Sequence, residues 1–151
     1  NQGNPDATFW VGLMYQIGSA KFSIEPNINE GKKWTLKAAN DGSAEAQEDI
    51  AETYYKDKDF VKSFEWFQKA VLSGSKNVQY RLGEMYYKGK GVKKDYFEAA
   101  KWFKLSADQK LFKAQFNLGI CYEKGHGVNK DILQANKLFK KAYKNLNKIT
   151  K

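Results

Sequence analysis

The stretch LGEMYYKGKGVKKDYFEAAKWF, residues 82–103, sets a pattern that the rest of the chain repeats. Its skeleton reads L-G-x-x-Y, then G-x-G-V-x-x-D, then A-x-x-W-F, and it occurs four times with substitutions. The four G-x-x-Y cores are separated by 39, 32 and 36 residues and begin at Gly12, Ala51, Gly83 and Gly119. Such a period is typical of tandem helical repeats. The sequence therefore predicts an all-α array of about four antiparallel helix pairs, at about residues 4–41, 42–73, 74–109 and 110–145.

The first helix of each predicted pair carries a small residue at the start of its core motif. Three repeats place glycine there, although glycine inside a helix costs about 1 kcal/mol relative to alanine. The second repeat uses Ala51, the next smallest residue. We expect the partner helix of each pair to approach the backbone closely at this position.

The second helix of each pair is predicted to begin at a residue that caps helix N-termini well. These residues are Asn27, Asp59, Asp95 and Asp131. Apolar and aromatic residues then recur at intervals of three or four, which places them on one helix face. At the start of the chain, Gly3 matches a helix terminator and Pro5 an early residue of the first helix.

Composition indicates a folded domain. Of the 151 residues, 42% are hydrophobic and 15% aromatic, which is enough for a core and argues against disorder. No run of about 18 apolar residues is present, so we expect no membrane span. The sequence does not open with a charged and then apolar signal pattern, but it begins with Asn1 rather than Met. We expect residue 1 not to be the beginning of the gene.

The net charge of +9 is distributed unevenly. Residues 1–75 contain 8 Lys and 11 acidic residues, a net charge of −3, whereas residues 76–151 contain 18 Lys or Arg and 6 acidic residues, a net charge of +12. Arg81 is the only arginine. Because bidentate phosphate recognition favours the planar guanidinium group, this lysine-rich surface favours solvated charge over a phosphate-binding patch, and we do not expect nucleic acid to be the main partner.

The residues that bear reactive groups do not form a catalytic or metal-binding pattern. His126 is the only histidine and occupies a loop position, so we expect it to be exposed and unconstrained. Cys121 is the only cysteine and lies between packing positions, so we expect a buried thiol. Gly89 and Gly91 lack the strand and longer motif of a phosphate-binding loop and indicate a turn. We expect no catalytic residue, no cofactor and no metal site.

In its ordered combination of motifs, nearly the whole chain resembles the Sel-one-like repeat family, a relative of the tetratricopeptide repeats. The matching features are the G-x-x-Y core, the G-x-G-V turn, the aspartate cap and the W-x-x-K-A-A-like ending, which follow one another in order. The departures are an enlarged first loop, a short second loop, and Leu138 in place of the tryptophan. The resemblance implies a right-handed α-α superhelix whose first helices line a concave face. It also implies an adaptor scaffold of the kind found in bacterial envelopes, signalling or host contact, which favours a periplasmic or secreted location.

The related tetratricopeptide arrangement implies which side chains line that face, namely positions on the first helices that do not serve core packing. Exposed apolar and aromatic side chains gathered on one surface are typical of an interaction site. The predicted partner-binding residues are Phe9, Leu13, Glu48, Glu52, Tyr55, Tyr80, Glu84, Tyr87, Phe116 and Ile120.

The sequence thus predicts a monomeric, non-enzymatic scaffold that binds a protein or peptide partner. Because Glu48, Glu52 and Glu84 lie among the predicted binding residues, we expect the partner to carry apolar and basic positions. Two alternatives remain open. One is binding of an anion or a nucleic acid through the lysine-rich C-terminal half, and the other is an immunity protein that neutralises a secreted effector.

Overall fold

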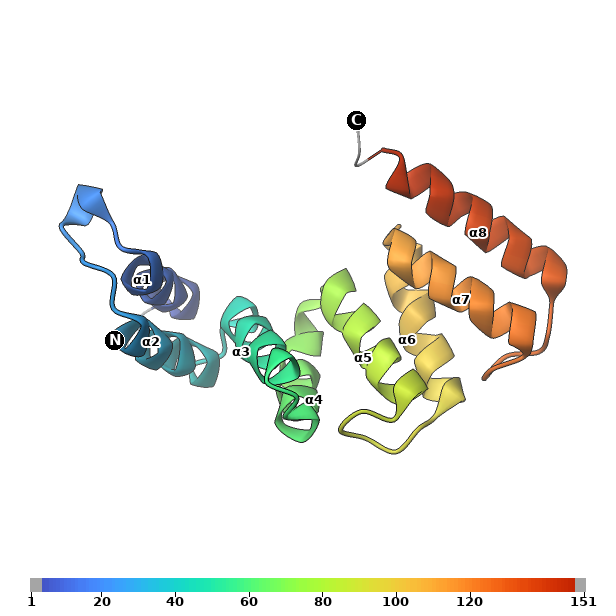
Figure 1. The fold of residues 1–151 in the computed structure, drawn as a ribbon, viewed down its shortest axis with the longest axis horizontal. Coiled ribbons are helices and arrows are strands. Elements are labelled where there is room, and N and C mark those ends of the chain that lie inside the picture. Colours follow the sequence, from blue (N-terminus) through green and yellow to red (C-terminus); the bar gives the residue numbers. More distant parts are fainter. Residues whose placement is uncertain (1–3, 149–151) are drawn as a thin grey trace. The chain divides into compact units, whose positions relative to one another are not determined.

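The computed structural model describes residues 4–148, and this part of the chain is built from helices (Figure 1). Among these residues there are eight α-helices and two 3-10 helices, and an isolated bridge pairs Ser19 with Ile24 in place of a strand. The elements are α1 (Pro5–Ile17), η1 (Ala20–Phe22), α2 (Ile28–Asn40), α3 (Ala44–Lys56), α4 (Phe60–Ala70), η2 (Val71–Ser73), α5 (Lys76–Lys88), α6 (Tyr96–Asp108), α7 (Phe112–Lys124) and α8 (Ile132–Leu146).

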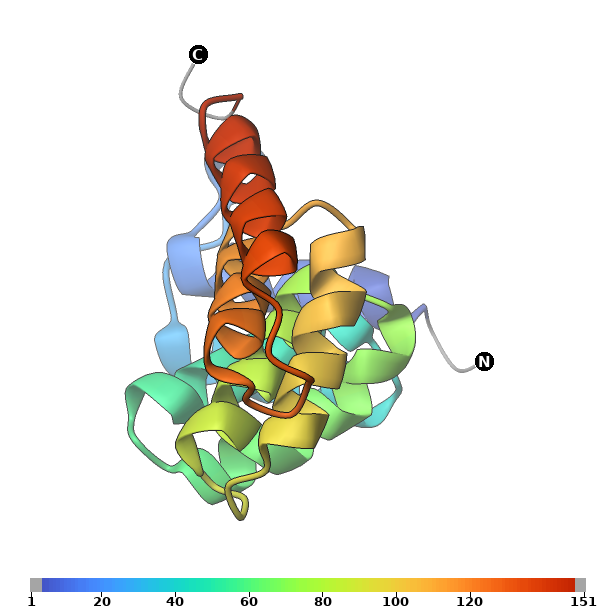
Figure 2. The same ribbon diagram turned by 90° about the vertical axis from the view of Figure 1, so that its right-hand side faces the viewer.

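The helices form consecutive pairs that belong to two compact units. The first unit, Asn1–Ser73, holds the pairs α1–α2 and α3–α4, and the second, Gly74–Lys151, holds α5–α6 and α7–α8. Within the second unit, α7 and α8 run side by side along their lengths (Figure 2). The predicted all-α helix-pair fold is therefore confirmed.

Close approach of the paired helices accounts for the helical glycines. A Cβ atom added to Gly119 would lie 2.5 Å from Cε1 of Phe139, and one added to Gly83 would lie 2.6 Å from Cδ1 of Phe103. Both distances are too short for any real contact, so these rings occupy the space that a side chain would need. At the corresponding Ala51, the backbone carbonyl instead accepts a hydrogen bond of 2.8 Å from Ser63 Oγ.

The predicted caps are confirmed. Asp95 accepts hydrogen bonds from the amides of Phe97 and Glu98, and Asp131 accepts one from Gln134. Each of these carboxylates therefore satisfies amide groups that the first helical turn leaves without a partner. Asn27 and Asp59 cap α2 and α4 in the same way. Pro5 is the first residue of α1, whereas Gly3 lies outside the described residues.

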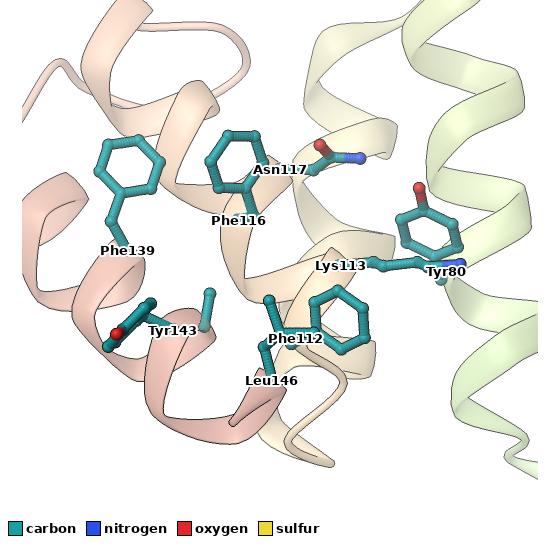
Figure 3. Close-up of a pocket in the computed structure, with 9 residues that line it drawn as sticks. Tyr80, Phe112, Lys113, Phe116, Asn117, Phe139, Tyr143 and Leu146 are labelled. Carbon is teal, nitrogen blue, oxygen red and sulfur yellow. The ribbon is translucent and has the colours of Figure 1, made fainter. Parts of the chain in front are cut away.

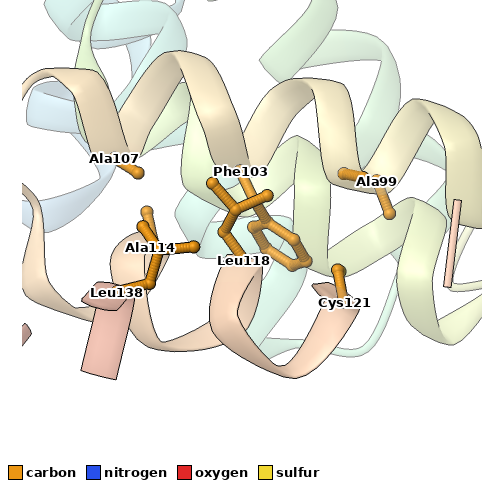
Figure 4. Packing of buried hydrophobic residues seen from close by; sticks show 8 residues of the cluster. Ala99, Phe103, Ala107, Ala114, Leu118, Cys121 and Leu138 are labelled. Carbon is orange, nitrogen blue, oxygen red and sulfur yellow. The ribbon is translucent and has the colours of Figure 1, made fainter. Parts of the chain in front are cut away.

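The second unit is held together by a buried cluster that spans three of its helices (Figure 4). Phe103 of α6 and Leu118 of α7 lie near its centre, and small side chains fill the space around them. Cys121 belongs to this cluster and is fully buried, as predicted from its position in the repeat. The other buried members are Ala99, Ala100, Ala107, Ala114 and Leu138.

Candidate partner-binding surface

The five predicted residues of the second unit lie around two neighbouring pockets on α5 and α7. One pocket, of about 160 Å³, is lined by four of them, Tyr80, Glu84, Tyr87 and Ile120. Phe116 lines the second pocket, which it shares with Tyr80. We call these five residues the α5–α7 surface.

The tyrosines of the α5–α7 surface rest on the core of the unit. The ring of Tyr80 lies 6.0 Å from that of Phe103, and the ring of Tyr87 lies 6.1 Å from it, measured between centroids. Both tyrosines are half-buried as a result. Their positions are therefore fixed by packing before any partner arrives, which lowers the entropy cost of binding.

Glu84 is held between two cations of its own helix. Its carboxylate accepts hydrogen bonds from Lys88 Nζ at 2.8 Å and from Arg81 Nη1 at 3.0 Å, and the residue is only 8% exposed. Burial acts to raise the pKa of Glu84, but the hydrogen bonds and charges of Lys88 and Arg81 lower it overall. The expectation that Glu84 offers a free negative charge to a basic partner is therefore wrong, because its charge is already compensated.

Tyr80 is joined to the same network. Burial raises the pKa of its phenol to about 12, and the charge of Glu84 and a hydrogen bond to that carboxylate contribute. Tyr80 therefore stays neutral, and it lines the smaller pocket together with Glu84 of α5 and Asn117 of α7.

The second pocket, which we call the α7–α8 pocket, has a volume of about 390 Å³ and mostly apolar walls (Figure 3). Lys113 and Asn117 are its polar lining residues, and Tyr80 and Tyr143 add hydroxyl groups. Phe116 is 51% exposed and Tyr143 is 69% exposed, so aromatic surface lies open to solvent. The remaining lining residues are Tyr80, Phe112, Phe139, Ala142 and Leu146.

His126 is not the exposed and unconstrained residue that the sequence suggested. Its Nδ1 lies 2.9 Å from the hydroxyl of Tyr87, and its ring stacks on Tyr96 with centroids 4.2 Å apart. The neighbouring Gly127 lies directly against the backbone of Tyr96, where a Cβ atom would overlap the carbonyl. The α7–α8 loop is therefore packed against α5 and α6.

The five predicted residues of the first unit are not gathered in the same way. Phe9 is only 7% exposed and packs with Ala38, Ala39 and Ala46, so its predicted exposure on a binding face is wrong. Leu13 is partly buried against the same cluster. One pocket of this unit lies between α2 and α3 and another at the loop between α1 and α2, and neither includes any of the five.

The other first-unit candidates are Glu48, Glu52 and Tyr55, all partly buried on α3. The ring of Tyr55 meets that of Phe60 edge-on, with centroids 5.2 Å apart. This contact ties Tyr55 to the first residue of α4. The predicted residues therefore gather around pockets in the second unit and not in the first.

Sequence reasoning missed the contribution of α8. Phe139, Tyr143 and Leu146 follow one another at intervals of four and three, which is the spacing of a helix face. They form a second apolar stripe beside the buried one of Leu138 and Ala142. That spacing was the available signal, and it was hidden because the repeat pattern ends near Tyr143.

The described residues offer no assembled metal site, since no group of three or more His, Cys, Asp or Glu side chains comes together among them. Burial raises the pKa of the Cys121 thiol to about 11, so it is a poor nucleophile. Within residues 4–148, none of the helices is both long and apolar enough to cross a membrane.

Paired helices in tandem, with pockets on the first helices of one unit, define this chain as a helix-pair repeat protein. The Sel1 repeat model matches residues 5–43, 44–75, 77–111 and 112–145. The chain belongs to the Sel1 repeat family. Proteins of this family are typically protein-interaction scaffolds that bind protein partners, and they are generally non-enzymatic.

Solved structures of bacterial repeat proteins share this fold. A Sel1 repeat protein from Oxalobacter formigenes is 29% identical with a TM-score of 0.83, over 95% of this chain and 59% of that one. A protective antigen of uropathogenic Escherichia coli with the SLR fold is 34% identical with a TM-score of 0.74, over 97% of this chain and 33% of that one. The chain thus spans less than two thirds of these relatives. The curated proteins gave no significant match.

A third relative is the cysteine-rich protein B of Helicobacter pylori. It is 30% identical with a TM-score of 0.56, and the match covers 76% of this chain and 90% of that one. The present chain, in contrast, has a single cysteine, Cys121, which is buried. The likeness therefore lies in the repeat and not in cysteine content.

Proposed function

We propose that this chain is a non-enzymatic scaffold that binds a partner protein or peptide on the α5–α7 surface. The observation that carries the proposal is the gathering of five predicted residues around two adjoining pockets in one unit. Membership in a family of interaction scaffolds supports it. Binding would bury apolar anchors in a preformed surface, with little reorganisation of the protein.

The residues that would provide binding energy differ from those that build the repeat. Phe116 and Ile120 lie one turn apart on α7, and Phe116 is half exposed. Aromatic and aliphatic side chains of this kind, fixed by a rigid floor, act as anchors in protein interfaces. Gly119, between them in sequence, serves packing against Phe139 instead.

The proposal is tested by capture of partner proteins from source cells on the immobilised full chain, followed by mass spectrometry. Ile120→Ser should reduce capture at least tenfold while circular dichroism remains unchanged. Leu72→Ser is the matched control, because Leu72 is 93% exposed on η2 and lies outside the surface. Equal capture by the parent chain and by Ile120→Ser would refute the role of this surface.

Binding of an anion or a nucleic acid is the second candidate. It is favoured by one observation, namely that α8 carries four lysines and no acidic residue. Affinity for nucleic acid would then fall steeply as salt is raised. A mobility-shift measurement at two salt concentrations separates this candidate from protein binding.

A further inference from the structure

One side of α8 carries a partly exposed apolar stripe, Phe139, Tyr143 and Leu146, that forms one wall of the α7–α8 pocket. Tyr143 and Leu146 in this stripe are 69% and 38% exposed, and Phe139 lies beside them (Figure 3). The ring of Phe139 packs against Gly119 and lies 5.3 Å from the ring of Phe116 on α7, between centroids, whereas Tyr143 and Leu146 remain exposed. The exposed rings of Phe116 and Tyr143 line the same cavity. An exposed apolar surface of this kind is typical of an interaction site.

The repeat itself indicates what shape of occupant fits such a stripe. Phe103 and Ala107 of α6 stand 36 residues before Phe139 and Tyr143 and hold the same repeat positions. On α6 these positions are covered by a helix, because Ala114, Leu118 and Cys121 of α7 pack into the same buried cluster (Figure 4). The stripe of α8 therefore stands where the preceding repeat receives a helix with a small residue and, four positions later, an aliphatic one, with Tyr143 in the place of Ala107.

Charge indicates the other property of the occupant. Residues 112–146 contain seven lysines and two acidic residues, a net charge of +5. Lys113 lines the α7–α8 pocket, and Lys140 and Lys144 are exposed on α8 directly after Phe139 and Tyr143. Glu84 of the neighbouring pocket is compensated by its own helix and does not offset this charge. Complementary charge would favour an acidic partner and oppose a basic one.

We infer that the α7–α8 pocket binds an acidic amphipathic helix of a partner protein. Its small and aliphatic residues would lie against Phe139, Tyr143 and Leu146, and its carboxylates would face Lys113, Lys140 and Lys144. This assignment rests on the proposed scaffold function and specifies the partner. It reverses the charge that the sequence predicted for the partner, because Lys113 and no glutamate among the described residues lines the α7–α8 pocket, and the exposed Lys140 and Lys144 follow Phe139 and Tyr143 on α8.

The chain contains a helix with the required properties, which supplies a probe. The sequence of α3 has Ala46 and Ile50 at a spacing of four and, with four acidic residues and one lysine, carries a net charge of −3. A fluorescent, hydrocarbon-stapled peptide with this sequence would be titrated with the full chain, since an isolated helix of this length is marginal without a staple. The matched control has Glu45→Gln, Glu48→Gln and Glu52→Gln, which brings its net charge to zero.

We expect the acidic peptide to bind, and the neutral peptide to bind at least fivefold more weakly at low salt. Tyr143→Ser and the double variant Lys140→Glu with Lys144→Glu should each weaken binding of the acidic peptide at least fivefold. These side chains are exposed, so the variants should fold. Equal binding of the two peptides, or binding unaffected by Tyr143→Ser, would overturn the assignment. So would self-association of the chain, measured by sedimentation, that Tyr143→Ser abolishes, because a second copy would then cover α8.

Partner capture separates failure of this assignment from failure of the scaffold function. Capture that is lost in Ile120→Ser but kept in Tyr143→Ser would retain the scaffold and overturn the helix site on α8. Capture that neither variant changes would overturn both. Tight binding of nucleic acid that competes with the acidic peptide would also overturn the assignment.

Discussion

The hydroxyl of Tyr87 lies 2.9 Å from Nδ1 of His126 and joins α5 to the loop between α7 and α8. Tyr96, at the start of α6, stacks on the same imidazole ring. One side chain in a loop thus contacts both helices of the preceding pair. The partly buried hydrogen bond and the stacking together make this contact a structural element of the second unit.

Loss of the Tyr87–His126 contact should destabilise the protein. Tyr87→Phe should lower the free energy of unfolding by about 1 kcal/mol, and His126→Ala by about 1–2 kcal/mol because it also removes the stacked ring. The double variant should lose less free energy of unfolding than the two single variants added together, since both changes remove the same hydrogen bond. Urea denaturation measures all three, with the exposed Glu123→Ala as control. Strict additivity would contradict a direct bond.

Gly119→Ala should be destabilising, although alanine favours helices by about 1 kcal/mol over glycine. The added methyl would lie 2.5 Å from the ring of Phe139, so that ring must move. We expect a net loss of about 1–3 kcal/mol, the usual range for overpacking. Thermal denaturation would detect it, and Lys113→Ala on the exposed side of α7 should change stability little. A stabilised Gly119→Ala variant would show that the helices are not in close contact.

Glu84 should make stability depend on pH in the acid range. Its pKa is lowered from 4.5 because the hydrogen bonds and charges of Lys88 and Arg81 outweigh the opposing effect of burial. The unfolded chain then binds a proton more readily than the folded one, so the stabilisation is present above pH 4.5 and is lost as the pH falls through the lowered pKa.

The free energy of unfolding, measured by urea denaturation, should therefore decrease more steeply between about pH 6 and pH 3 for the parent chain than for Glu84→Gln. Glu65→Gln, at an exposed position on α4, is the control and should follow the parent chain. If Glu84→Gln showed the same pH dependence as the parent chain, the ion pairs of Glu84 would contribute nothing to stability.

Cys121 should be protected from alkylation in the folded protein. Its thiol is fully buried, and burial raises the pKa to about 11, so little thiolate is present at pH 8. Iodoacetamide should therefore react at least about a hundredfold more slowly than with a free thiol of ordinary pKa. In urea the rate should rise to the ordinary value. Rapid modification under native conditions, followed by mass spectrometry, would contradict the burial.

The fold could be predicted from sequence because its determinants are local or periodic. Gly83 and Gly119 are required because a ring of the partner helix touches the backbone there, and the other two pairs also place a small residue, Gly12 or Ala51, at this position. Asp95 and Asp131 cap a helix through amides two or three residues away. Neither feature depends on knowing which surfaces remain open.

The candidate site was predicted less well because exposure depends on residues far away in sequence. Phe9 is covered by Ala39 and Ala46, and the sequence around Phe9 does not predict this contact. The compensation of the Glu84 charge, in contrast, could have been predicted from the sequence. Arg81 and Lys88 lie three and four residues away from Glu84, the spacings at which charges pair on a helix. The contribution of α8 required knowing that Tyr143 and Leu146 remain exposed among the described residues 4–148.

The contact of Gly127 with the backbone of Tyr96 bears on how the second unit fluctuates. Because the α7–α8 loop lies on the first turn of α6, the last pair cannot swing away without freeing that turn as well. Amide hydrogens in α6 and α7 should then exchange in a common opening event rather than repeat by repeat. A ligand held only on α8 would therefore slow the opening of a helix that it never touches.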